Sequence, residues 1–170
     1  MKRILLSILL AAAYALPAHA VYFGASAGIF QSTSQPYIAA RLGSEVLGGD
    51  LFSHNLEAEV GYASDSRNGA SANLMPVTLN YRARVAGGSR LGVYVGGGAG
   101  VARTHFSGYG YSESAWALAS QVFAGISLKL SDNASLDFGA RYLRISIQVY
   151  GSNIQLGHDT ALEGGLHLKF

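Results

Sequence analysis

The sequence predicts an all-β protein: an eight-stranded, antiparallel, up-and-down transmembrane β-barrel with a filled polar lumen. Three observations lead to this prediction. Apolar and polar residues alternate in eight segments, an export-type leader precedes the first segment, and the last segment ends on the aromatic residue Phe170. Because successive side chains of a strand point to opposite faces, such alternation gives each strand one apolar and one polar face.

The leader comprises residues 1–20 and has the layout of a cleaved secretory signal peptide. A basic start precedes an apolar run over residues 4–13, and residues 18–20 form a small-x-small cleavage site. An uncleaved membrane anchor is the alternative, but the apolar run is shorter than the roughly 20 residues that a spanning helix needs. We therefore expect a mature domain of residues 21–170.

The charge balance and cysteine content exclude several classes of protein. The chain has 12 Lys and Arg against 10 Asp and Glu, and Lys2 and Arg3 lie in the leader, so the remainder is formally neutral. This balance does not suit a nucleic-acid-binding protein. The chain has no Cys, which excludes disulfides and thiol chemistry. No apolar stretch after residue 20 reaches spanning-helix length, so a membrane-embedded domain must cross as a closed barrel of strands.

The eight alternating segments are each about ten residues long or longer, which suits tilted spanning strands. They comprise residues 21–30, 36–46, 51–63, 72–85, 90–104, 115–130, 134–146 and 158–170.

The connections between the segments alternate in length. Tight or moderate turns, rich in Gly, Asp and Asn, are expected at residues 47–50, 86–89 and 131–133. Polar and mostly longer loops are expected at residues 31–35, 64–71, 105–114 and 147–157. Short turns at one end and longer loops at the other are typical of an outer-membrane barrel with both termini in the periplasm.

The two faces are clearest from the third segment onward. One face is apolar and carries, in chain order, Leu56, Val60, Leu79, Tyr81, Val93, Val95, Val122, Ile126, Phe138, Tyr142, Leu166 and Leu168. The opposite face carries charge on almost every segment, except in the fifth, where a row of glycines suits a tightly filled lumen. A soluble carrier barrel with its apolar face inward is the alternative. The recurring charge, the aromatic residues near strand ends and the terminal Phe favour the membrane barrel.

Three stretches carry a family resemblance: residues 91–100 (LGVYVGGGAG), 131–143 (SDNASLDFGARYL) and 164–170 (GGLHLKF). With them, the chain resembles the small outer-membrane β-barrel superfamily, including the opacity-like and outer-membrane-protein-A-like barrels of Gram-negative bacteria. The resemblance implies a fold and a location in the bacterial outer membrane, but not an activity. Apolar residues alternating up to the terminal aromatic resemble the signal that the barrel-assembly machinery reads in that family; they are Leu162, Leu166, Leu168 and Phe170.

The inward-facing charged residues form the most interpretable site. They are Glu57, Glu59, Arg82, Arg84, Asp137, Arg141, Glu163, His167 and Lys169. If the last two strands pair about a loop centred near residue 152, Arg141 lies opposite Glu163, and Asp137 opposite His167. Buried charges need partners, and eight strands leave room for side chains rather than for an open channel. We therefore expect a plug of salt bridges and not an open porin.

The outward-facing residues predict contacts with lipid. Aromatic girdles are expected at the two rims, from Phe23, Phe52 and Phe170 at one and Tyr62, Trp116 and Tyr142 at the other. Arg103 and Arg144 also point outward near the loop end. One interpretation is contact with lipopolysaccharide phosphates, and the other is snorkelling at the interface.

No catalytic, cofactor-binding or metal site is expected. Barrel deacylases carry a His-x-Ser-Asn element near the end of the seventh strand, where this chain has no His before Ser146. His158 and Asp159 point to opposite faces of a strand, and His105 has no obvious nucleophile beside it. The Tyr-, Ser- and Gly-containing loops at 105–114 and 147–157 suit either a surface ligand or solvated tips.

The sequence thus predicts an envelope-structural or surface-interaction protein of the outer membrane. An enzyme that modifies lipid or lipopolysaccharide is the alternative, and a soluble periplasmic carrier is the third interpretation. Expected partners are outer-membrane lipid, lipopolysaccharide and the barrel-assembly machinery.

Overall fold

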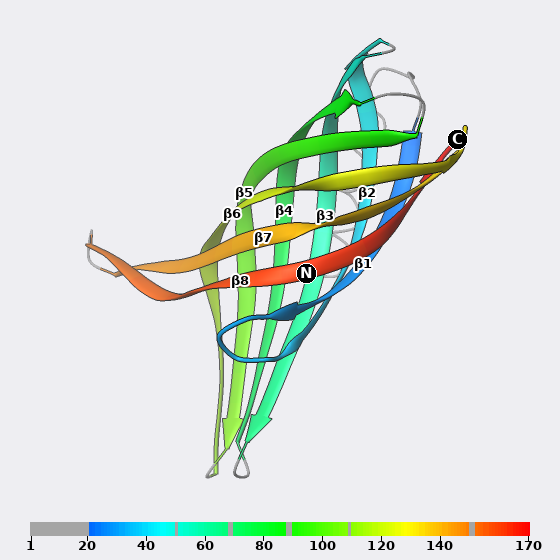
Figure 1. The fold of residues 1–170 in the computed structure, drawn as a ribbon. Coiled ribbons are helices and arrows are strands. Elements are labelled where there is room, and N and C mark those ends of the chain that lie inside the picture. The colour runs from blue at the N-terminus through cyan, green and yellow to red at the C-terminus, as the bar shows by residue number, and fades with distance from the viewer. Residues whose placement is uncertain (1–20, 50, 68–69, 88–89, 109, 150–151) are drawn as a thin grey trace.

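The chain folds into a closed antiparallel β-barrel of eight strands in sequential order (Figure 1). The computed structural model describes residues 21–49, 51–67, 70–87, 90–108, 110–149 and 152–170. The predicted signal peptide, residues 1–20, lies outside the described residues.

Every strand pairs antiparallel with its neighbours along the chain, and β8 pairs with β1 to close the barrel. The strands are β1 (Val21–Phe30), β2 (Pro36–Gly48), β3 (Phe52–Arg67), β4 (Ala70–Ala86), β5 (Leu91–Gly108), β6 (Tyr111–Ser131), β7 (Ala134–Val149) and β8 (Ser152–Lys169). The predicted fold class and strand count are confirmed. Within the described residues, no helix is long and apolar enough to cross a membrane.

Three of the four predicted loops are shorter than expected. β5 reaches Gly108 and β6 starts at Tyr111, so most of 105–114 is paired strand, and the same holds for 64–71 and 147–157. The polar side chains of these regions predicted loops. The backbone hydrogen bonds between the strands nevertheless continue through them, because strand pairing does not depend on side-chain polarity. Strands of 16 to 21 residues therefore exceed the roughly 9–11 residues that span a bilayer.

The long strands make the barrel wall uneven. In Figure 1 the β3–β4 and β5–β6 hairpins extend well beyond the β1–β2 connection, so one side of the wall is low. The start of β1 and the end of β8 lie together at the opposite end, where Phe170 N–H donates to the carbonyl of Val21 at 2.9 Å. We call the end with the long hairpins the loop end and the other the turn end.

The outer surface of the barrel is apolar. Leu79 and Val95 are each 60% exposed, and Val122 is 59% exposed. Soluble monomers do not leave an apolar surface of this extent in water, but the same surface matches the hydrocarbon of a bilayer. The direction of the pattern, apolar outward and polar inward, is therefore that of a membrane barrel.

The glycine row of β5 makes room for large side chains inside the barrel. A Cβ atom at Gly96 would overlap the ring of Phe123, and one at Gly98 would overlap the side chain of Asn80. Glycine at these positions lets neighbouring bulk fill the lumen. This agrees with the prediction of a tightly filled interior.

Candidate functional site

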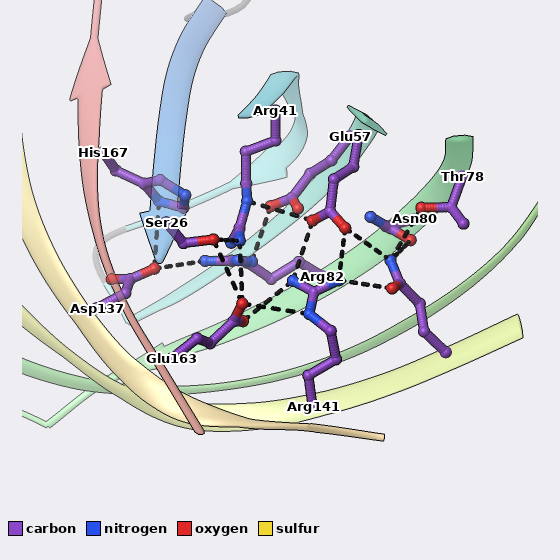
Figure 2. A network of polar contacts seen from close by, with 12 residues as sticks. Ser26, Arg41, Glu57, Thr78, Asn80, Arg82, Asp137, Arg141, Glu163 and His167 are labelled. Carbon is purple, nitrogen blue, oxygen red and sulfur yellow. Dashed lines mark hydrogen bonds and ion pairs between the residues drawn. The ribbon is translucent and has the colours of Figure 1, made fainter. Parts of the chain in front are cut away.

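A cluster of buried ion pairs fills the middle of the lumen (Figure 2). At its centre is Arg141 of β7, whose side chain has no solvent exposure. Its Nη1 lies 2.5 Å from Oε1 of Glu59 on β3, and its Nη2 lies 3.0 Å from Oε1 of Glu163 on β8. Nη1 also donates to the side-chain oxygen of Gln121 at 2.6 Å. One planar guanidinium thus joins three other strands of the barrel.

Arg41 of β2 supports the same two carboxylates. Its Nε lies 3.4 Å from Glu59 and its Nη2 lies 3.7 Å from Glu163, while Nη2 donates to Ser26 Oγ at 2.7 Å. Arg41 is not among the charged lumen residues predicted from the sequence. Arg41 lies in the second alternating segment, between the outward-facing Ala40 and Leu42. This alternation would have predicted that Arg41 faces the lumen.

Arg82 of β4 organises a second group of charges nearer the turn end. Its Nη1 donates to Asp137 at 2.6 Å, and its Nε lies 2.7 Å from Glu57. Tyr22 donates to the same carboxylate of Glu57 at 2.6 Å. The Arg82 guanidinium also lies over the ring of Tyr94, 4.4 Å from its centroid, a cation–π geometry.

The two groups together contain four buried carboxylates and three arginines. Each buried carboxylate has an arginine partner, and the paired groups are Glu57, Glu59, Asp137 and Glu163 with Arg41, Arg82 and Arg141. We call these seven residues the lumen plug. Arg82 and Arg141 each contact two buried carboxylates, so removing either arginine leaves two buried charges without that partner.

Polar uncharged residues extend the lumen plug across β4 and β6. The Gln121 amide donates to Thr78 Oγ1 at 2.9 Å, to Asn80 Oδ1 at 2.8 Å and to Glu59 at 3.2 Å. Side chains from both halves of the barrel wall thus meet across the interior, which leaves no room for a wide channel at this level.

The predicted register of the last two strands is wrong by two residues. Residue 139, not Arg141, is the Cα partner of Glu163, and Ser135, not Asp137, is the partner of His167. The strands stay paired as far as Val149 with Ser152, so the hairpin is centred before residue 152, and the register shift between Ile145 and Ser146 offsets only part of that difference. The ion pair of Arg141 with Glu163 forms nevertheless, because the long arginine side chain reaches diagonally along the lumen.

Three of the sequence-predicted lumen residues lie at the turn end, apart from the centre of the plug. His167 Nδ1 is 3.4 Å from Asp137, and Lys169 pairs with Glu45 at 3.1 Å while half exposed. Arg84 is half-buried and lines, with both, a polar cavity of about 490 Å³ that opens at this end.

The other half of the lumen, toward the loop end, is apolar. Its buried core includes Phe30, Ala102, Ala117, Leu143 and Ile145. Above this core lies a cavity of about 520 Å³, the mouth cavity, whose apolar lining includes Phe30, Ala63, Leu74, Ala115, Leu143 and Ile145. This division of the lumen was not predicted from the sequence, where only the charged inward positions were assigned to it. The alternation around Leu143 and Ile145 carried the signal, because both share the face of Arg141.

The aromatic residues predicted to form girdles lie on the outer surface of the barrel. Each is exposed on the outer surface, and the set comprises Phe23, Phe52 and Phe170 toward the turn end with Tyr62, Trp116 and Tyr142 farther along the wall. Of the terminal alternating residues, Leu162, Leu166 and Phe170 are exposed and Leu168 is half-buried.

Arg103 and Arg144 are both exposed on the outer surface. Arg103 is the Cα partner of Trp116 on β6, and Arg144 is the partner of His158 on β8. The ring of His158 lies 5.8 Å from that of Tyr142. Each arginine therefore has a ring-bearing side chain as its cross-strand neighbour on the outer surface of the barrel.

His105 has a hydroxyl beside it, contrary to the sequence interpretation. Its Nδ1 lies 2.8 Å from Ser114 Oγ, because the two residues are Cα partners in the β5–β6 hairpin that was expected to be a loop. Among the described residues, no carboxylate is hydrogen-bonded to His105, and no group of three His, Cys, Asp or Glu side chains is placed to hold a metal ion.

Comparisons with known proteins agree with this architecture. The family model described as the outer membrane protein beta-barrel domain matches residues 4–170. No curated protein sequence matches the chain. Among solved structures, it is similar to Neisserial surface protein A, with 18% identity and a TM-score of 0.62 over 89% of this chain and 96% of that one.

Two further structures are similar at this level. The N-terminal β-barrel domain of OprF from Pseudomonas aeruginosa has 13% identity and a TM-score of 0.62, over 89% of this chain and 98% of that one. The attachment invasion locus protein Ail of Yersinia pestis has 12% identity and a TM-score of 0.59, over 89% and 97%. At these identities the likeness concerns the fold alone.

Proposed function

Because the chain belongs to the outer membrane protein beta-barrel domain family of the bacterial outer membrane, we propose that it is a closed barrel with an envelope-structural or surface-interaction role. The proposal has two parts. The lumen is a structural plug rather than a conduit, and the loop end and outer surface carry the contacts with other molecules.

The lumen plug is the observation that carries the first part. Arg141 and Glu57 have no exposed surface, and Glu59 is 2% exposed, although all three lie inside the barrel. The cavities at the two ends are therefore separated by side chains that solvent does not reach. An open porin instead has a continuous aqueous path, which larger barrels provide.

A planar-bilayer recording tests the plug directly. We expect the purified protein to give no large steady conductance, whereas a porin reconstituted in parallel supplies the positive control. Protein orientation and insertion are checked by protease protection and heat-modifiable gel mobility. A porin-like steady conductance from the inserted protein contradicts the proposal.

The second part rests on the long hairpins. The β3–β4 and β5–β6 hairpins extend beyond the low side of the wall (Figure 1). We propose that their ends, which are rich in polar residues, lie outside the bilayer. The regions 105–114 and 147–157 suit either a surface ligand or solvated tips from their sequence. They belong to the β5–β6 and β7–β8 hairpins, and the side chains of 147–157 lie outside the described residues. We propose that any surface ligand contacts these hairpin ends.

Arg103 and Arg144 are proposed to contact phosphate groups of lipopolysaccharide. Replacing both with Gln is expected to lower, severalfold, the lipopolysaccharide that co-purifies with the protein, because the planar guanidinium matches phosphate oxygens. The measurement is phosphate and sugar content per barrel after mild detergent extraction. The matched control is Arg90→Gln with Lys129→Gln, which removes two exposed charges at the turn end. Equal lipopolysaccharide in both double variants excludes the contact.

We further propose that the protein is not an enzyme. The contact of His105 with Ser114 supplies two groups found in hydrolases, yet neither is buried, and no described carboxylate orients the histidine. Nucleophilic catalysis by serine depends on a base held in position by a third group. A lipid-modifying enzyme is therefore the less favoured interpretation of this barrel.

A further inference from the structure

We propose that the mouth cavity binds a small amphiphile that has an apolar body and a cationic head, such as an alkylammonium compound. The cavity measures about 520 Å³, a size typical of small-molecule sites. It opens at the loop end of the barrel and is closed below by the apolar core that includes Leu143 and Ile145, so it is a cup rather than a passage.

The walls of the cup suit an apolar body. Leu143 and Ile145 are buried at its base, and the small side chains of Ala63 and Ala115 leave space above them. In an empty cup this apolar lining faces water. An inserted alkyl or aryl group removes apolar surface from water on both ligand and protein, which is the main driving force in such sites.

The rim of the cup suits a positive charge. Three acidic side chains line the cavity, namely Asp65, Glu113 and Asp159, and the lining residues that the structure describes include no Lys or Arg. Asp159 is held in place because it accepts hydrogen bonds from the backbone N–H and hydroxyl of Ser32. A carboxylate or sulfate head would meet like charge at this rim, whereas an ammonium head meets opposite charge.

The uneven wall gives the ligand an entrance. Ser32 and Thr33 of the β1–β2 connection line the low side, and residues of the taller β3–β4 and β5–β6 hairpins line the other side (Figure 1). A ligand can therefore enter from outside the bilayer without any movement of the lumen plug. This inference is independent of the proposed closure of the lumen, since a conductance result does not alter it.

Binding is tested with the full barrel in phospholipid nanodiscs. The probe is decyltrimethylammonium at a concentration below micelle formation, and titration calorimetry reports its binding. Empty nanodiscs measure partitioning into lipid, and decyl sulfate is the anionic counterpart. We expect saturable binding of the cation at one site per barrel, and weaker binding of the anion. Binding equal to that of empty nanodiscs, or a preference for decyl sulfate, overturns the proposal.

Variants locate the site. Ala115→Phe fills part of the mouth cavity with an aromatic ring. We expect it to lower the affinity for the cation by about tenfold or more, because the ring occupies the space that the apolar body of the ligand needs. Ala124→Phe makes the same change on the lipid-facing side of β6 and should leave binding intact. Heat-modifiable mobility confirms that each variant is folded.

Glu113→Gln tests the rim separately. Glu113 is exposed, so the change leaves the barrel intact. We expect the ratio of cation to anion affinity to fall by about threefold to tenfold, as expected for one nearby charge. An unchanged ratio, or an Ala115→Phe variant that is folded and binds normally, shows that the probe does not occupy the cup.

Discussion

Replacing Arg141 with Met is expected to lower the free energy of unfolding by about 3–5 kcal/mol, the usual effect of removing one partner from a buried ion pair. Glu59 and Glu163 would both lose a guanidinium contact inside the barrel. Arg41 still contacts both carboxylates, but at 3.4 and 3.7 Å, which does not replace the shorter contacts of Arg141. The measurement is equilibrium unfolding in urea, followed by the fluorescence of the single tryptophan, Trp116.

Two controls show whether burial explains the effect. Lys129→Met breaks the exposed ion pair with Asp132 and should change stability by less than about 1 kcal/mol. Adding Glu163→Gln to Arg141→Met removes one of the stranded charges, so the double variant should be less destabilised than the sum of the single variants. Equal effects of Arg141→Met and Lys129→Met would contradict the role of burial. Simple additivity of Arg141→Met and Glu163→Gln would contradict the coupling of these two buried charges.

Replacing Phe170 with Ala is expected to prevent most of the protein from reaching the outer membrane in folded form. Phe170 is 77% exposed at the turn end, so its ring contributes little to packing within the barrel. If it is read as an assembly signal, the loss should occur in cells and not during refolding of the purified chain into detergent. The fraction folded is measured in both settings by heat-modifiable gel mobility.

Phe52→Ala is the matched control for this experiment. Phe52 is another exposed aromatic residue near the turn end, 57% exposed at the start of β3. Its replacement removes a girdle ring but leaves the last strand unchanged. Normal assembly of Phe170→Ala in cells excludes the signal, and a refolding defect in detergent assigns Phe170 a structural role instead.

Much of the barrel was predictable because strand geometry has a period of two. The alternation around Tyr81 and Arg82 predicts that Tyr81 faces outward and Arg82 faces the lumen. In the structure Tyr81 is exposed and Arg82 is buried. Turn residues such as Asp132 and Asn133 marked the ends of strands at one end of the barrel. At the loop end the same reasoning failed, since the polar residues of 105–114 continue the β5–β6 ladder.

The candidate site was predictable as a set of charged positions, not as a set of contacts. Arg141 and Glu163 form an ion pair although they are not opposite one another, because a long side chain spans two residues of register. Ser114 lies beside His105 only once the hairpin register is known. The partners of a charge in a barrel depend on register, which local alternation does not define.

The sequence by itself determined the strand number, the inward and outward faces and the charged character of the lumen, since these follow from the local period and composition. Tertiary structure alone decided which charges meet, that Arg41 joins them, and that the lumen divides into a charged plug and the apolar mouth cavity. The physical reason is that closing the barrel brings residues distant in the chain to the same height. Phe30, Ala63 and Leu143, for example, come together in one apolar cluster only when the barrel is closed.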